Sequence, residues 1–266
     1  MASPIQRYDD YSSSGPIVAA QASVSDRTAF ILKVYGLVFV GLIIFFASAL
    51  IPTIGLFMGV PGLSEFAAFF VQLNPLISML LILGTSFAVH WIANIPGINL
   101  LGLAGFSAIW GFLTINLIAY ACFKMAPTGA QGLEFLGPGL LVVSQAAALT
   151  FLAMGLLTAY VFISKQDFNF LGGFLFVGMI MMIIAVLAAI VIPMMGFTSF
   201  LGVEFNILYV GLSIVSVLLM VGYILYDTSN VLHHYPTTMA VAAALALLSD
   251  FIILFRNILF LLLNRR

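Results

Sequence analysis

Apolar residues run in long stretches from about residue 28 to the C-terminus, and charged residues occur only at a few points between them. The longest uncharged stretch, between Glu65 and Lys124, is well over twice the about 20 residues that a helix needs to cross the hydrocarbon core. It must hold two crossings, because residues 94–99 (Asn-Ile-Pro-Gly-Ile-Asn) carry a turn signal. The whole pattern predicts an all-α membrane protein of seven transmembrane helices, at about residues 28–51, 73–93, 98–123, 138–163, 170–194, 205–231 and 238–263.

The N-terminal segment differs from the rest of the chain. It is rich in Ser, Gly and Asp and lacks the apolar core of a signal peptide. We expect residues 1–26 to form a disordered polar tail, with residues 25–27 capping the first helix. The seven-helix transmembrane domain then occupies residues 27–266, with short loops except around 52–70 and 124–137.

Composition supports the membrane assignment and excludes other classes. Apolar residues make up 64% of the chain and charged residues 6%, against about 25% charged in ordinary soluble domains. The net charge of −1 provides no basic surface for a phosphate backbone, so nucleic acid is not an expected partner. A single cysteine, Cys122, excludes an internal disulfide and a cysteine metal cluster. The lipid bilayer is the expected surrounding, and no cofactor is expected.

Two carboxylates fall inside predicted spans. Asp227 lies near the end of the sixth predicted helix and Asp250 midway along the seventh. A central Asp costs at least about 2.5 kcal/mol on insertion scales, so an intramembrane carboxylate is a functional hypothesis by default. Counted from the turn at Pro236 at about 1.5 Å per residue, their depths differ by roughly 8 Å, which helix tilt and side-chain reach can reduce. Neighbouring antiparallel helices therefore allow contact between Asp227 and Asp250.

Such contact would have specific chemical consequences. Two carboxylates a few ångströms apart in a low dielectric do not both ionise easily, so they would share a proton. When deprotonated they can also hold a hard divalent cation through oxygen ligands, which makes Asp227 and Asp250 candidate transient calcium ligands. Both properties suit a proton-sensitive gate. The alternative is a protonated pair that only holds the two helices together by a hydrogen bond.

Four further ionisable residues are candidate modulators. Arg256 lies about 120° round the helix from Asp250. It can pair with an acidic group on another helix, but we expect it to snorkel to the headgroups near the chain end. His233 and His234 adjoin the loop after the sixth helix, where histidines can modulate gating, and no third ligand lies nearby to form a zinc site. His90, near the end of the second predicted helix, fits an interfacial belt.

Four segments carry a resemblance to a known family. They are Val-Tyr-Gly-Leu at 34–37, Leu-Thr-Ala-Tyr at 157–160 with the following segment 164–173, Leu-Tyr-Asp-Thr-Ser-Asn at 225–230, and Ala-Leu-Leu-Ser-Asp-Phe-Ile at 246–252. Together they resemble the Bax inhibitor one family, also called transmembrane Bax inhibitor motif proteins, over most of the chain from Arg27 onward.

The resemblance implies both a fold and a function. It implies six helices around a central seventh helix, and a pH-sensitive calcium leak channel whose proton sensor is the aspartate pair, here Asp227 and Asp250. Eukaryotic members restrain cell death from organelle membranes, and some bacterial members modulate a membrane-bound AAA protease, which is thus a candidate partner beside calcium and protons. The polar tail and short loops resemble the bacterial branch, which implies an inner (cell) membrane location.

Some positions depart from the family pattern. Members commonly carry basic residues at the turn between helices two and three, whereas residues 94–99 have none and His90 is the nearest candidate. An Asn usually follows three residues after the Asp of helix seven, but this chain has Ile253 there and Arg256 as an addition. These departures concern the groups expected to hold the gate closed (the gating latch) more than the aspartate pair expected to be the proton sensor.

Two other functions stay open as alternatives. One is a membrane regulator that binds a membrane protease or another partner and conducts nothing. The other is an intramembrane aspartyl protease, because Tyr226-Asp227 matches one motif of those enzymes. Their second motif, Gly-x-Gly-Asp, reads Leu-Leu-Ser-Asp at residues 247–250, so we do not expect an enzyme.

Overall fold

The computed structural model describes residues 17–93, 95, 97–130, 132–197, 199–200 and 203–265. In chain order its helices are α2 (Val24–Met58), α3 (Leu63–Val71), α4 (Pro75–Ile92), α5 (Asn99–Phe112), α6 (Ile115–Met125), α7 (Leu136–Ser164), α8 (Gly172–Met194), α9 (Phe205–His233) and α10 (Ala240–Leu263). Two 3-10 turns, η1 (Gly132–Phe135) and η2 (Asn169–Leu171), precede α7 and α8. A short antiparallel hairpin joins α8 to α9, with β1 (Ser199–Phe200) paired to β2 (Val203–Glu204).

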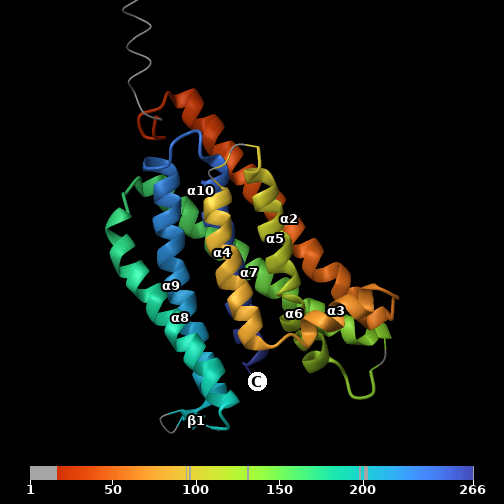
Figure 1. Ribbon diagram of the computed structural model, residues 1–266. Coiled ribbons are helices and arrows are strands. Elements are labelled where there is room, and N and C mark those ends of the chain that lie inside the picture. Colours follow the sequence, from red (N-terminus) through yellow and green to blue (C-terminus); the bar gives the residue numbers. More distant parts are fainter. Residues whose placement is uncertain are drawn as a thin grey trace, which may run out of the picture.

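The long helices form a bundle of membrane-spanning segments. Within the described residues, 6 helices are long and apolar enough to cross a bilayer, and a bent pair brings the number to as many as 7. The bent pair is α3 with α4, whose axes meet at 98°. In Figure 1 the turn between α9 and α10 lies at one end of the bundle, and the C-terminus lies near the other. The prediction of an all-α membrane bundle is confirmed.

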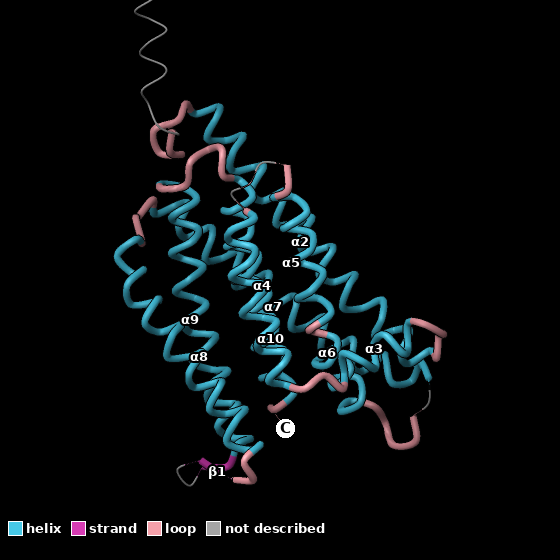
Figure 2. Tube along the Cα trace, in the orientation of Figure 1, coloured by secondary structure: helices cyan, strands magenta, loops and turns pink. Residues whose placement is uncertain are grey.

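Helix α10 is the centre of the bundle. It packs against α2, α5, α6, α7 and α9, while α4 packs on α5 and α8, and α8 packs on α9. Figure 2 shows α10 running between the helices on either side. Most α10 residues are buried. A helix at the surface of a membrane bundle would instead expose one face to lipid. This confirms the central position predicted for the seventh helix.

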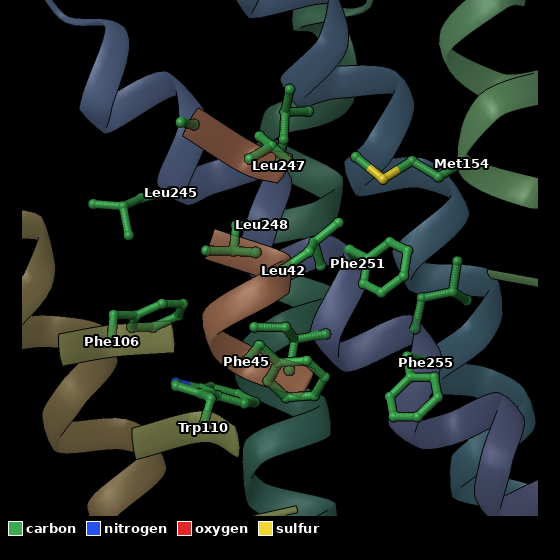
Figure 3. Packing of buried hydrophobic residues seen from close by; sticks show 14 of the residues in the cluster. Leu42, Phe45, Phe106, Trp110, Met154, Leu245, Leu247, Leu248, Phe251 and Phe255 are labelled. Carbon is green, nitrogen blue, oxygen red and sulfur yellow. The ribbon is translucent and has the colours of Figure 1, made fainter. Parts of the chain in front are cut away.

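Aromatic and leucine side chains from α2, α5 and α10 fill the centre (Figure 3). Phe45 and Phe255 are both fully buried and meet edge to face, with ring centroids 5.9 Å apart. This is a favourable arrangement for two aromatic quadrupoles. Leu248 and Phe251, also fully buried, continue this layer along α10 toward its N-terminus.

Two glycines allow neighbouring helices to approach closely. A Cβ atom on Gly111 of α5 would lie 2.5 Å from the backbone carbonyl oxygen of Phe45 in α2. A Cβ atom on Gly139 of α7 would overlap the backbone of Cys122 in α6. Without a hydrophobic driving force between helices in lipid, such close packing is a main source of association.

The helix limits correct three predictions. The first helix begins at Val24, where the Ser23 hydroxyl caps it by accepting the N–H of Asp26 at 3.2 Å, and it continues through Pro52. The loop expected at residues 52–70 therefore holds the end of α2 and most of α3. The third predicted helix, 98–123, is broken between α5 and α6.

The boundary of the N-terminal tail is also different from the prediction. Val18 forms a β-bridge with Pro236, and the N–H of the fully buried Ala19 donates to the carbonyl of Tyr235 at 3.0 Å. These backbone bonds hold residues 17–19 against the turn between α9 and α10, and residues 24–26 already belong to α2, so neither segment is part of a tail. The remainder of the expected tail, residues 1–16, lies outside the described residues.

Candidate functional site

The structure brings Asp227 and Asp250 together. Asp250 lies midway along α10 with only 4% of its surface exposed. The carboxyl group of Asp227, on α9, interacts with it both as a charge and through a side-chain hydrogen bond. The Oδ2 atom of Asp250 is buried and has no hydrogen-bond partner among the described residues. The depth difference estimated from the sequence is thus closed by the packing of α9 on α10.

Two tyrosines lie close enough to this aspartate pair to interact with its charges. Tyr223 of α9 and Tyr235 of the following turn both interact electrostatically with Asp227 and Asp250. Burial, and then those charges, raise the pKa of Tyr235, so its hydroxyl stays protonated and can donate. Within the described residues no basic side chain contributes to the charge environment of Asp250. The negative charge therefore has to be balanced by a proton or by an incoming cation.

The two carboxylates alone do not form a complete metal site. No group of three or more His, Cys, Asp or Glu side chains with metal-binding geometry occurs in the described part of the chain. Calcium takes six to eight oxygen ligands, and two carboxylates supply at most four. Water would have to supply the rest, so the described residues do not form a complete calcium site by themselves.

Beside the aspartate pair, the end of α9 holds the loop between α7 and α8. The buried N–H of Phe168 donates to the Ser229 hydroxyl at 2.9 Å. Nε2 of His234 lies 2.9 Å from Oδ2 of Asp167, whose Oδ1 accepts the N–H of Asn169 at 2.9 Å. The Asn169 bond, followed by the interaction with His234, lowers the pKa of Asp167. We call these contacts the loop lock.

Of the histidines predicted as modulators, His234 belongs to the loop lock and His233 lies beside it. His234 pairs with Asp167, and the Nδ1 of His233 lies 3.1 Å from the carbonyl oxygen of Ser229, one turn earlier. His90 is part of α4, but its side chain is outside the described residues. Sequence reasoning identified residues 164–173 only by resemblance and missed their contacts with Ser229.

The prediction that Arg256 snorkels to the headgroups is wrong. Its Nη1 donates to the carbonyl oxygen of Leu113 and to Oγ1 of Thr114, each at 2.9 Å. These residues form the break between α5 and α6, where backbone carbonyls lack helical donors. A cation at the C-terminal end of α5 is also favoured by the helix dipole. Arg256 therefore stabilises an interrupted helix inside the membrane, where unpaired carbonyls are costly.

A central apolar helix with a buried carboxylate, inside a bundle of 6 or 7 spans, defines a multi-pass integral membrane protein. Comparison with known families gives the more specific assignment. The family described as "Inhibitor of apoptosis-promoting Bax1" matches residues 27–266, which is nearly the whole chain. The chain therefore belongs to the Bax inhibitor family, as the four sequence segments predicted.

Relatives from distant organisms match almost end to end. A protein of Campylobacter jejuni is 30% identical over 258 residues, covering 95% of each chain. Bax inhibitor 1 of Schizosaccharomyces pombe is 27% identical over 258 residues, covering 94% of this chain and 81% of the relative. A Golgi anti-apoptotic protein of vaccinia virus is 27% identical over 257 residues, covering 96% and 92%.

Proposed function

We propose that this protein is a proton-sensitive calcium leak pathway in which Asp227 and Asp250 form the proton sensor and transient calcium ligands. The observation that carries the proposal is the position of Asp250: it is buried in the central helix, beside a second carboxylate, with one oxygen unpartnered. An ionisable residue inside a membrane is costly, and such residues mark ion and proton pathways.

The proposed switch follows from the charge of the pair. With one shared proton, Asp227 and Asp250 are joined by a hydrogen bond that holds α9 against α10, and the negative charge is reduced. Loss of the proton leaves two carboxylates that repel each other and attract a hard cation. Calcium permeation is then favoured at higher pH, and protonation favours the closed packing.

Calcium flux into dye-loaded proteoliposomes between about pH 6 and 8 tests the proposal. Wild type should give a flux that rises with pH, whereas Asp227→Asn and Asp250→Asn should give pH-independent flux. Glu204→Gln, which removes an exposed carboxylate at the start of α9, is the matched control and should behave as wild type. An unchanged pH profile in both Asp variants would refute the sensor.

A second candidate function rests on the names of two relatives. The names of Bax inhibitor 1 and the Golgi anti-apoptotic protein refer to the inhibition of Bax and of apoptosis. A membrane regulator can have such an effect by binding a partner, without conducting ions. For a chain of a bacterial inner membrane, a membrane-bound AAA protease is the partner to test.

Deletion of residues 1–16 separates this second function from the first, because it leaves the Val18 bridge to the α9–α10 turn intact. Capture of the protease that depends on those residues, together with no calcium flux from folded protein, would favour the regulator. We propose no enzymatic activity. Cleavage of a model transmembrane peptide that is lost in Asp250→Asn would contradict this and favour the aspartyl protease.

A further inference from the structure

Arg256 faces a cavity that is separate from the aspartate pair. The cavity measures about 560 Å³, within the size range of ligand sites, and lies between α4, α5, α6, α8, α9 and α10. A neighbouring groove of about 330 Å³ between α4 and α8 shares several walls with it, including Ile82, Asn116, Met182 and Arg256. Neither α4 nor α8 is among the helices that pack closely on α10, so we expect this groove to open toward the lipid.

The walls combine one positive charge with an apolar surface. Arg256 is the charged residue among the described lining residues of both cavities, and neither lining contains a carboxylate. Side chains such as Leu117, Met182, Val186 and Phe260 make up most of the remaining wall. An enclosure of this kind disfavours cations, so it is not a calcium site.

No acidic side chain in the described part of the chain compensates the charge on Arg256. Its hydrogen bonds to described residues come from Nη1 and go to two neutral acceptors, and no acidic group in that part of the chain pairs with it. The two bonds fix the guanidinium plane, and the other two nitrogens keep their donors for a ligand. A part-buried cation without a counter-charge is costly, whereas a guanidinium binds a carboxylate or phosphate through parallel hydrogen bonds.

Two more polar atoms at this cavity have no partner. Nε1 of Trp110 and Oδ1 of Asn116 are buried without a hydrogen bond among the described residues, and both residues line the cavity. Unsatisfied buried polar atoms are rare in native structures and call for a ligand or an ordered water. Both residues belong to the lining that also contains Arg256.

We propose that this cavity binds an anionic amphiphile, with a phosphate or carboxylate headgroup on Arg256 and an acyl chain along the apolar walls toward the α4–α8 groove. Phosphate and carboxylate share the chemistry that a guanidinium recognises, and a phospholipid or a free fatty acid can supply it. This inference does not depend on calcium conduction, since it uses neither Asp227 nor Asp250.

The two tryptophans allow a direct binding test. Trp91 is 81% exposed and Trp110 is 3% exposed, so Trp91→Phe leaves one reporter in the cavity wall. The purified variant, in a neutral detergent, is titrated with phosphatidylglycerol, phosphatidylcholine or stearic acid whose acyl chains carry bromine, a short-range quencher of indole fluorescence. We expect saturable quenching of Trp110 by an anionic probe, and at least tenfold weaker binding of phosphatidylcholine. The tighter of the two anionic probes identifies the source of the headgroup.

Variants then test whether Arg256 provides the charge that binds the anionic headgroup. In the Trp91→Phe background, Arg256→Gln should weaken the anionic probe at least tenfold, and Arg256→Lys should weaken it less. Lys33→Gln, which removes an exposed charge on α2, should leave binding unchanged. Because Arg256→Gln also removes the bonds to the α5–α6 break, a competition experiment in the unchanged cavity gives a second measurement. The unbrominated form of the tighter anionic probe should displace the brominated one, and phosphatidylcholine should not.

Three results would overturn the proposal. The first is binding of phosphatidylcholine that is as tight as binding of the tighter anionic probe. The second is a folded Arg256→Gln variant with unchanged affinity. The third is displacement of the probe by millimolar inorganic phosphate alone, which would show that the site selects a free anion and needs no acyl chain.

Discussion

Replacing Gly111 by Ala tests the close contact between α5 and α2. The added Cβ would lie 2.5 Å from the carbonyl oxygen of Phe45, 2.7 Å from Cβ of Ser48 and 3.3 Å from the backbone nitrogen of Ala49. Two of these atoms belong to the backbone of a helix, which cannot rotate away as a flexible side-chain end can. The helices must therefore separate or tilt to accept the methyl group.

The magnitude follows from two opposing effects. Overpacking of a well-packed core costs about 1–3 kcal/mol, and backbone contacts below 3 Å place this site in the upper half of that range. The better helix propensity of Ala returns about 1 kcal/mol. We expect a net destabilisation of about 1–2 kcal/mol in Gly111→Ala.

Gly105→Ala is the matched control on the same helix. No atom lies within 4 Å of the Cβ that it would add, so only the propensity gain applies and the variant should be unchanged or slightly more stable. The two variants should therefore differ by about 2 kcal/mol, or roughly 4–8 °C in the midpoint of thermal unfolding followed by fluorescence-detected gel filtration. Equal midpoints would show that α2 and α5 are not in contact at Gly111, and the packing described here would be wrong.

Three further changes test other parts of the structure. Ser229→Ala leaves the buried N–H of Phe168 without an acceptor and should lower the free energy of unfolding by about 1–3 kcal/mol. Ser249→Ala is the control, because the Ser249 hydroxyl bonds within its own helix, and it should be neutral. Equal effects of the two variants would refute the loop lock. Asp167→Asn should lower stability by less than about 1 kcal/mol at pH 7, because the group is half exposed. Folding lowers the pKa of that carboxyl, so its contribution is present above the unfolded value of about 3.9 and is lost as the pH falls through the folded value. The stabilities of wild type and variant should therefore converge as the pH falls below about 3.9, and a constant difference would contradict the assignment. Phe255→Ala removes a fully buried ring from the central helix and should cost about 3–5 kcal/mol in the same assay, whereas a small loss would place α10 at the lipid surface.

The sequence predicted the parts of the fold that the bilayer imposes directly. Charged residues are so scarce that the intervals between them mark the spans, and the predicted limits of α4, α7, α8, α9 and α10 agree with the structure within a few residues. The same scarcity singled out Asp227 and Asp250. Their contact needed the structure, because the side-chain direction on each helix and the tilt between helices are set by packing.

The break between α5 and α6 carries only a weak local sequence signal. Gly111 lies one residue before the end of α5, but the segment 112–115 reads Phe-Leu-Thr-Ile and contains no Pro. Its stabilising partner, Arg256, is 142 residues from Thr114 in the sequence. Periodicity and composition describe neighbouring residues, so they cannot reveal a helix break that is stabilised by a distant side chain. Helix α3 was missed for a different reason, because its 9 residues are too short for a span and follow the turn residues Pro61 and Gly62.

The polar groups of α10 bind in different directions, and this limits how the proposed sensor can work. Asp250 faces Asp227 on α9, and Arg256 faces the α5–α6 break. One residue further on, Asn257 donates to the Ser216 hydroxyl of α9 at 2.9 Å. The C-terminal half of α10 is therefore hydrogen-bonded both to α9 and to the α5–α6 break. The aspartate pair lies two turns nearer to the α9–α10 turn than these bonds do. If a change of protonation alters the helix packing, the movement is therefore expected at the end of α9 that carries the loop lock, while the Arg256 end of α10 stays in place.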